Sequence, residues 1–302
     1  MVESQDNFVT LPYRPRQDPM TETRLSFTDH NRPFFGLETV YPVVSRRAGG
    51  VSVGINLNQN NACNWACEYC QVPGLVRGKA APTDLNQLER ELNFLLDAVT
   101  QEAFLETYVP VELRHLKDIA FSGNGEPTSS DQFSGAMDIA LRALEQRPPL
   151  HSVKIITITN GSHVQEPAVL HALESSTKHG GELWFKIDRG SSEDIWQVNQ
   201  IHLSLQQIQH RLATVAPHCP TWIQTCMTTR DGVAPSTEEV QRYLDFIRHI
   251  KDAQIPIKGI LLYTLARLSL QPGGTRLGAI PGTWMAALAE KIEALGVPVV
   301  TV

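Results

Sequence analysis

From about residue 49 onward, short runs of apolar residues alternate with longer segments in which apolar residues recur every three or four positions. The short runs are rich in valine and isoleucine, which is typical of parallel strands buried on both faces. They predict six strands, at residues 51–57, 118–121, 153–158, 183–187, 222–227 and 257–263. No internal repeat and no low-complexity segment interrupts this rhythm.

The longer segments between these runs predict amphipathic helices. In residues 83–99, leucines at steps of three and four mark one apolar face. Ser236, with Glu239 three positions later, predicts a capping box at the start of another helix, and Gly296 predicts the end of a helix over 284–295. Further helices are predicted at residues 130–144, 167–173 and 203–212. The alternation implies a parallel sheet with helical crossovers, either doubly wound or barrel-like.

A polar or glycine-rich motif directly follows each predicted strand. These motifs are residues 60–70, 122–128, 159–162, 186–190, 228–231 and 264–267. In parallel α/β folds the carboxyl ends of the strands form one face, and functional sites are built there. We therefore expect the six motifs to meet at one mouth of the sheet.

The first of these motifs contains three closely spaced cysteines, Cys63, Cys67 and Cys70. Three thiolates from one loop can bind three irons of a cubane cluster and leave the fourth iron without a protein ligand. An open coordination position is what metal-centred chemistry requires. A structural zinc site is the alternative, but such a site usually has four cysteine or histidine ligands, often as two separated pairs.

The composition of the chain indicates in which kind of cellular compartment this metal site would occur. The chain has 302 residues, of which 42% are hydrophobic, and a formal net charge of -6. This balance does not indicate binding to nucleic acid or an anionic membrane. Only five cysteines are present, and their clustering favours a metal site in a reducing compartment. Without an apolar leader or a long apolar run, we expect a cytoplasmic protein. Residues 1–48 are interpreted as an N-terminal extension and 49–302 as the core domain.

The cysteine triad, with the aromatic Tyr69 before its last member, resembles the signature of the radical S-adenosylmethionine (radical SAM) superfamily. The resemblance implies a partial, six-stranded (β/α)6 parallel barrel. It also implies that Cys63, Cys67 and Cys70 are the catalytic ligands of a 4Fe–4S cluster, which cleaves S-adenosylmethionine to a 5′-deoxyadenosyl radical. That radical would abstract hydrogen from a substrate that the sequence does not name. An electron donor such as flavodoxin or ferredoxin is implied as a partner.

The motif after the second strand resembles the Gly-Gly-Glu segment of this superfamily. Here it reads Gly123, Asn124, Gly125 and Glu126. In the superfamily this segment contacts the methionyl ammonium of S-adenosylmethionine, and glycines allow such close backbone approach. Glu126 is expected to accept a charge-assisted hydrogen bond from that ammonium. A tight turn is the structural alternative for this motif taken alone.

Further cofactor-binding residues are expected after the later strands. Thr159 and Asn160 resemble a segment that touches the ribose, although an ordinary Asn-Gly turn explains them equally well. Lys186 and Asp188 resemble a Lys-x-Asp pair that meets the cofactor carboxylate and a ribose hydroxyl or the substrate; an internal ion pair is the alternative. Arg267, between apolar neighbours, is expected in the same site, where an arginine suits an anionic group.

Within the superfamily, residues 45–47, 52–56, 123–128 and 262–267 resemble the branch of the tRNA wyosine-base synthases and their uncharacterised bacterial relatives. Those synthases hold a second cluster on additional cysteines. Here only Cys219 and Cys226 remain, and along one strand they would lie about 23 Å apart, too far to share a cluster. The tRNA activity is therefore not carried over.

Two other functions remain open at this stage. One is a non-enzymatic iron–sulfur or zinc-binding interaction module, which would have no use for the glycine-rich motifs. The other is a conventional α/β enzyme with an incidental cysteine loop. The position of a motif after every strand favours the radical SAM interpretation.

Overall fold

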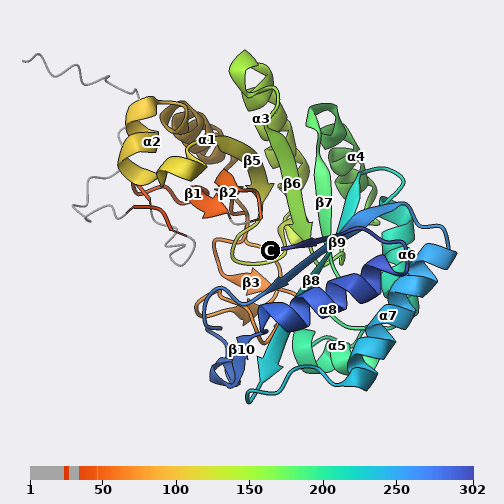
Figure 1. Ribbon diagram of the computed structural model, residues 1–302. Coiled ribbons are helices and arrows are strands. Elements are labelled where there is room, and N and C mark those ends of the chain that lie inside the picture. The colour runs from red at the N-terminus through yellow and green to blue at the C-terminus, as the bar shows by residue number, and fades with distance from the viewer. Residues whose placement is uncertain (1–23, 27–33, 46) are drawn as a thin grey trace, which may run out of the picture.

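The computed structural model describes residues 24–26, 34–45 and 47–302, and a curved sheet lies at its centre (Figure 1). The strand order is β1-β2-β5-β6-β7-β8-β9-β11. These strands are β1 (Val40–Ser45), β2 (Gly50–Ile55), β5 (Leu116–Phe121), β6 (Lys154–Thr159), β7 (Glu182–Lys186), β8 (Thr221–Arg230), β9 (Ile257–Thr264) and β11 (Val299–Thr301). Strands β2 to β11 pair in parallel, and β1 adds antiparallel to β2.

All six predicted strands are confirmed, and the sheet is the partial parallel barrel that the resemblance implied. Shorter strands were not predicted, because two or three residues carry too little periodicity to be recognised. They are β3 (Ala62–Cys63), β4 (Val76–Arg77), β10 (Leu277–Ala279) and the final strand β11. Strand β1 was also not predicted, because it lies before residue 49, in the segment that was interpreted as an N-terminal extension. The division into an extension and a core domain stays a prediction, since residues 1–23 and 27–33 lie outside the described part.

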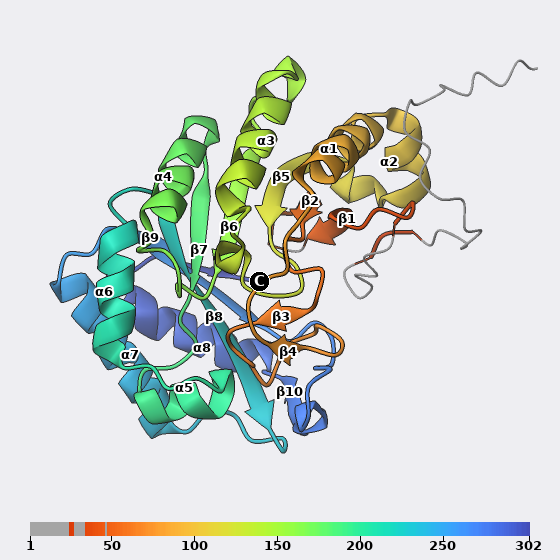
Figure 2. The ribbon, with the colours of Figure 1, turned by 180° about the vertical axis from the view of Figure 1, so that it is seen from behind.

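Helices cover the outer face of the sheet (Figure 2). They are α1 (Leu85–Val99), α2 (Glu102–Tyr108), α3 (Phe133–Glu145), α4 (Pro167–Ser176), α5 (Ser192–Asn199), α6 (Leu205–Val215), α7 (Thr237–Asp252) and α8 (Gly282–Glu293). All six predicted helices are present within a few residues of their expected ends, whereas α2 and α5 were not predicted. Among the described residues, the helices are too short or too polar to cross a membrane.

The main hydrophobic core lies between these helices and the sheet. Helix α7 begins with the predicted capping box, in which Ser236 and Glu239 each accept a hydrogen bond from the other's backbone N–H. Its buried face includes Tyr243 and Ile247, both fully buried. The Tyr243 hydroxyl lies 2.7 Å from Thr225 Oγ1 on β8, so this large side chain is both packed and hydrogen-bonded. Burial of each such side chain stabilises the fold by about 1.5–3 kcal/mol.

The inner face of the sheet differs from the outer face because it lines a hollow. On β2 the residues Val51, Val53 and Ile55 belong to the main core, while Ser52 and Gly54 alternate with them and face inward. The ring of Tyr41 on β1 packs so closely on Gly54 that a β-carbon there would lie 2.3 Å from Cζ. Strand β1 thereby covers one side of the hollow.

Candidate active site

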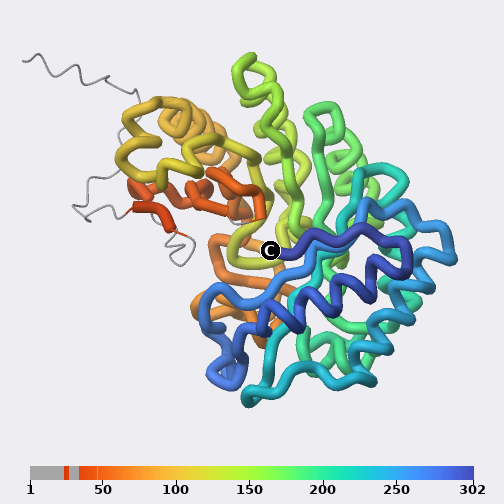
Figure 3. Tube along the Cα trace, viewed as in Figure 1, coloured from red at the N-terminus to blue at the C-terminus, as the bar shows by residue number. Residues whose placement is uncertain are grey.

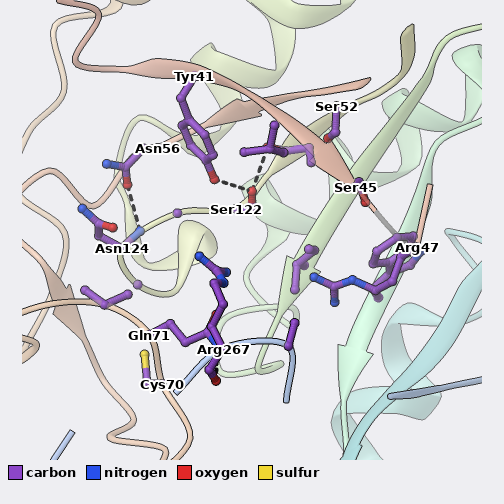
Figure 4. A pocket seen from close by; sticks show the side chains of 18 of the residues that line it. Tyr41, Ser45, Arg47, Ser52, Asn56, Cys70, Gln71, Ser122, Asn124 and Arg267 are labelled. Atoms are coloured by element: carbon purple, nitrogen blue, oxygen red, sulfur yellow. Dashed lines mark hydrogen bonds between the residues drawn. The ribbon is translucent and has the colours of Figure 1, made fainter. Parts of the chain in front are cut away.

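The hollow is a cavity of about 1040 Å³, which reaches from the cysteine loop down the inner face of the sheet (Figure 4). Its lining comes from β1, from the inner faces of the parallel strands and from the segment after β9. Cys70 of the triad lines it, as do Lys186 and Arg267. A cavity of this size has room for a cofactor and a second molecule.

The three cysteines lie on the loop that follows β2. Cys63 is on β3, where it pairs with Arg77 of β4, and the Cys70 backbone N–H donates to the Cys67 carbonyl at 2.9 Å. All three residues retain some exposed surface. In the described ranges, no set of three or more His, Cys, Asp or Glu side chains converges on one metal position. A cubane cluster does not require such convergence, because each thiolate binds a different iron.

Burial raises the pKa of the Cys63 thiol to about 12 and that of Cys67 to about 11. A thiolate at these positions therefore needs a compensating positive charge, which a bound iron cluster supplies. Lys186 favours the Cys67 thiolate electrostatically, and Asn199 Nδ2 donates to Cys67 Sγ at 3.3 Å. Both the spacing and the donors around the sulfurs fit a 4Fe–4S cluster.

The glycine-rich motif after β5 lies against the cysteine loop. A β-carbon on Gly125 would lie 2.0 Å from the carbonyl oxygen of Ala62, so only glycine allows this approach. Gly123 has φ +144°, and its β-carbon would lie 2.4 Å from Asn56 Oδ1. That same oxygen accepts a hydrogen bond from the Asn124 backbone N–H at 3.0 Å. The expected contact of this motif with S-adenosylmethionine stays a prediction.

Glu126 is buried, with 2% of its surface exposed, and its carboxylate joins two of the predicted motifs. Its Oε1 accepts hydrogen bonds from Thr128 Oγ1 at 2.5 Å and Thr159 Oγ1 at 2.7 Å, as well as from the Thr128 backbone N–H. Its Oε2 accepts from the Asn160 backbone N–H at 2.6 Å. A carboxylate oxygen can accept at least two hydrogen bonds, and Oε2 accepts one from the described residues, so it retains capacity for one further donor.

The Thr-Asn-Gly motif after β6 also contacts the cysteine loop. Asn160 Nδ2 donates to Asn64 Oδ1 at 2.8 Å. Gly161 has φ +75°, and a β-carbon there would lie 2.3 Å from the Phe185 ring. The sequence is therefore more restricted here than an ordinary Asn-Gly turn requires, although its role toward a ribose stays a prediction.

Lys186 and Asp188, at the end of β7, meet through Tyr69 of the cysteine loop. The Tyr69 hydroxyl donates to Asp188 Oδ2 at 2.5 Å and accepts from Lys186 Nζ at 2.9 Å. Asp188 also accepts from Asn199 Nδ2 at 2.7 Å and from the Cys226 backbone N–H at 2.8 Å. The Asp188 carboxylate thus fixes the loop and α5, and its expected contact with a ribose or substrate stays a prediction.

The residues around Lys186 keep its ammonium group charged. Burial alone lowers its pKa, but the neighbouring Tyr263 and Asp188 outweigh burial and hold the pKa above its ordinary value. Lys186 Nζ also lies 3.5 Å from the Tyr263 hydroxyl. The ammonium is therefore a positive charge on the cavity wall, close to the cysteine loop.

The last two motifs reach the cysteine loop from β8 and β9. Arg230 forms an ion pair with Glu68. The backbone oxygen of Arg267 accepts a hydrogen bond from Gln71 Nε2 at 2.9 Å, and its guanidinium is turned into the cavity (Figure 4). Figure 3 shows the orange cysteine segment beside the blue segment that follows β9. The other five predicted motifs therefore all meet at the cysteine loop, which is the first motif.

Sequence reasoning missed several residues of this site. Asn199 lies at the end of α5, a helix of eight residues that no periodicity marked. Ser52 and Asp118 line the cavity from strands that were predicted, and Arg47 lines it from the turn between β1 and β2. In residues 52–56 the apolar Val53 and Ile55 alternate with residues that are not apolar, Ser52 and Asn56 among them, and this alternation was an available signal for an inward-facing polar surface.

Comparison with known sequences identifies two relatives, and no family model matches the chain. A UPF0026 protein of Helicobacter pylori strain J99 is 26% identical over 228 residues, which are 72% of this chain and 65% of that protein. A UPF0026 protein of strain 26695 is 30% identical over 135 residues, covering 44% of this chain and 38% of that protein. The chain thus spans less than two thirds of the length of these curated relatives.

Several solved structures with a similar fold are radical SAM enzymes. A structure of TYW1, a wyosine synthase, with a lysine-pyruvate adduct bound has a TM-score of 0.53 at 13% identity, covering 80% of this chain and 73% of that one. A radical SAM methyltransferase from Sphaerobacter thermophilus has a TM-score of 0.55 at 13% identity, covering 87% and 68%. Streptococcus suis SuiB has a TM-score of 0.54 at 12% identity, covering 84% and 50%. The expected fold is confirmed, and TYW1 is among the solved structures that share it.

Proposed function

We propose that this chain is a radical SAM enzyme that acts on a substrate bound in the cavity below its cysteine loop. The observation that carries the proposal is that five strand-end motifs meet at the sixth, the loop with three cysteines, which borders that cavity. Cys63, Cys67 and Cys70 would hold a 4Fe–4S cluster. When bound, the cluster and S-adenosylmethionine would supply a 5′-deoxyadenosyl radical for hydrogen abstraction.

The chain's own residues bind and orient the cofactor in this proposal. Glu126 Oε2 has capacity for one donor and would accept from the methionyl ammonium. Gly123 and Gly125 allow the backbone to approach closely, since neither position tolerates a β-carbon. Lys186 would offer its positive charge to the cofactor carboxylate, and Asn160 would contact the ribose.

Strand β1 helps to exclude water from the reacting groups. Tyr41 packs on Gly54 and its hydroxyl lies 2.9 Å from Ser122 Oγ, so β1 is fastened across the inner face of the sheet. A reactive intermediate requires this kind of enclosure. The reaction also requires a low-potential, one-electron donor, for which a flavodoxin or a ferredoxin is suited.

The proposal is tested with protein purified and reconstituted without oxygen. We expect about four irons per chain, as a cubane cluster requires, and 5′-deoxyadenosine after addition of dithionite and S-adenosylmethionine, detected by mass spectrometry. Cys63→Ala, Cys67→Ala and Cys70→Ala are each expected to abolish the product. Cys219→Ala, in the main core and away from the loop, is the matched control and should retain it.

Two results would contradict this function. Binding of zinc in place of iron would favour a structural metal site. A complete iron–sulfur cluster that neither binds nor cleaves S-adenosylmethionine would favour a non-enzymatic interaction module.

A further inference from the structure

The cavity continues below the level of the cysteine loop to a group of side chains on the inner face of the sheet and on the turn between β1 and β2. We call Arg47, Ser52, Asp118, Trp184 and Gln224 the floor cluster; all five line the cavity. Asp118 lies three residues before the end of β5, which places it about 10 Å below the carboxyl end of that strand. The proposed cofactor contacts lie at or beyond the strand ends, so they do not account for the floor cluster.

Two members of the floor cluster are buried donors that lack an acceptor. Trp184 Nε1 and Gln224 Nε2 have no hydrogen-bond partner among the residues that the structure describes. Trp184 is 8% exposed and Gln224 is 1% exposed. An unpaired buried donor costs about 1–3 kcal/mol, so such groups usually serve a ligand or an ordered water. The floor cluster is therefore incomplete without an acceptor.

The floor cluster also carries one negative and one positive charge. The Asp118 carboxylate is 5% exposed and accepts a hydrogen bond from Ser52 Oγ. The Arg47 guanidinium carbon lies 5.4 Å from the centre of the Trp184 ring and 5.2 Å from that of Tyr263, between two aromatic side chains. No ion pair within 4.0 Å joins Arg47 to Asp118 in the described part of the chain.

These two charges restrict the kind of ligand that fits. A purely anionic group is repelled by Asp118, and a purely cationic group is repelled by Arg47. A neutral group forms an ion pair with neither charge, so it gains less in this buried site than a charged group does. A group with one ammonium and one carboxylate pairs with both charges. Its carboxylate oxygens also supply the acceptors that Trp184 and Gln224 lack.

We propose that the floor cluster binds the ammonium and carboxylate of a zwitterionic amino acid, which is the substrate of the proposed radical reaction. The ammonium lies on Asp118, and the carboxylate lies on Arg47 with Trp184 Nε1 and Gln224 Nε2 as further donors. This inference rests on the proposed function, since it deepens the assignment of the same cavity. Burial raises the pKa of Asp118 to about 6, so its carboxyl is mostly ionised at neutral pH and above.

S-Adenosylmethionine contains an amino-carboxylate group as well, but that group belongs near the cysteine loop in the proposed function. The floor cluster lies deeper along the strands and retains its own unpaired donors. Two amino-carboxylate sites in one cavity therefore correspond to two molecules. The experiment must separate them.

Binding is measured by calorimetry on the reconstituted protein without oxygen and without reductant. The ligands are the proteinogenic amino acids at millimolar concentration, followed by the deaminated and the decarboxylated analogue of any amino acid that binds. We expect at least one amino acid to bind and both analogues to bind more weakly. Asp118→Asn should weaken the amino acid about 10- to 100-fold, as loss of a charge-assisted hydrogen bond predicts, and should leave the deaminated analogue nearly unchanged.

Glu38→Gln is the matched control, because it removes the same charge from an exposed residue of the same cavity. It is expected to leave amino-acid affinity within about twofold, as surface charges contribute little. Circular dichroism and iron content establish that Asp118→Asn folds and carries its cluster.

Three results would overturn the assignment. The first is that no amino acid binds to the wild-type protein. The second is that Asp118→Asn and Glu38→Gln weaken binding equally. The third is that Asp118→Asn weakens S-adenosylmethionine as much as the amino acid, which assigns the floor cluster to the cofactor. None of these three results contradicts the proposed function if the wild-type protein still forms 5′-deoxyadenosine. Absence of 5′-deoxyadenosine contradicts the proposed function whatever the amino-acid binding shows.

Discussion

Asp118 provides a direct test of the floor of the cavity through the pH dependence of stability. Its carboxyl is buried, and burial raises its pKa from 3.8 to about 6. Ser52, Arg47 and Lys154 oppose this rise, and Glu182 adds to it. The perturbation is Asp118→Asn, in which the carboxamide oxygen can still accept the Ser52 hydrogen bond but the charge is absent at every pH.

The sign of the effect follows from the direction of the pKa change. The folded chain binds the Asp118 proton more tightly than the unfolded chain does, so ionisation costs stability as pH rises from about 4 through about 6. A difference of about two pKa units corresponds to about 3 kcal/mol when ionisation is complete. About half of this cost is present near pH 5. We therefore expect Asp118→Asn to gain about 1.5 kcal/mol relative to the wild type between about pH 5 and about pH 8.

The assay is urea-induced unfolding of both proteins, prepared in parallel in the same metal state and compared at each pH. Terms common to the two proteins cancel in the difference between their unfolding free energies. Asp138→Asn, at an exposed position on α3, is the control and should show a difference that does not change with pH. A pH-independent difference for Asp118→Asn would refute the conclusion that its carboxyl is costly to ionise in the folded protein.

Three further predictions concern the cysteine loop. Asn199→Ala removes a hydrogen bond to Cys67 Sγ and should lower the reduction potential of the cluster by roughly 40 mV without changing the iron content. Redox titration followed by electron paramagnetic resonance measures this potential, and an unchanged potential would contradict a role for the hydrogen bond. Gly125→Ala forces the loop away from the Ala62 carbonyl and should destabilise the protein by about 1–3 kcal/mol in urea unfolding, with reduced iron content. Glu126→Ala leaves several buried donors without an acceptor and should lower the free energy of unfolding by roughly 3 kcal/mol or more. Glu126→Gln should lower it by less, and equal stability of the two variants would show that these hydrogen bonds contribute little.

The strands and helices could be predicted because their pattern depends on burial alone. Each parallel strand is buried by helices on its outer face, and the crossover helices show one apolar stripe each. Helix α5 escaped prediction because its eight residues form barely two turns and its buried residues include Asp194 and Asn199. Strand β1 escaped because it was read together with the polar segment that precedes it.

The residues of the candidate site also fall into a predictable and an unpredictable group. The motifs at the strand ends could be predicted, since topology alone brings the carboxyl ends of parallel strands together. Contacts such as those of Asn199 with Cys67 and Asp188 depend on where an unpredicted helix ends. The floor cluster depends on the curvature of the sheet, which turns Asp118 and Gln224 toward one hollow. Curvature is a property of the whole sheet, and local sequence does not encode it.

The hydrogen bonds around the cysteine loop show that its shape is set from outside the loop. Asn64 is held by the segment after β6, Tyr69 by the end of β7, and Glu68 by the end of β8. The loop itself has little secondary structure besides the two-residue pairing of β3 with β4. The three sulfurs therefore take their positions only when the parallel strands are assembled. It follows that a mutation at a strand end can alter the cluster without touching a cysteine, because the strand ends are what position the ligands.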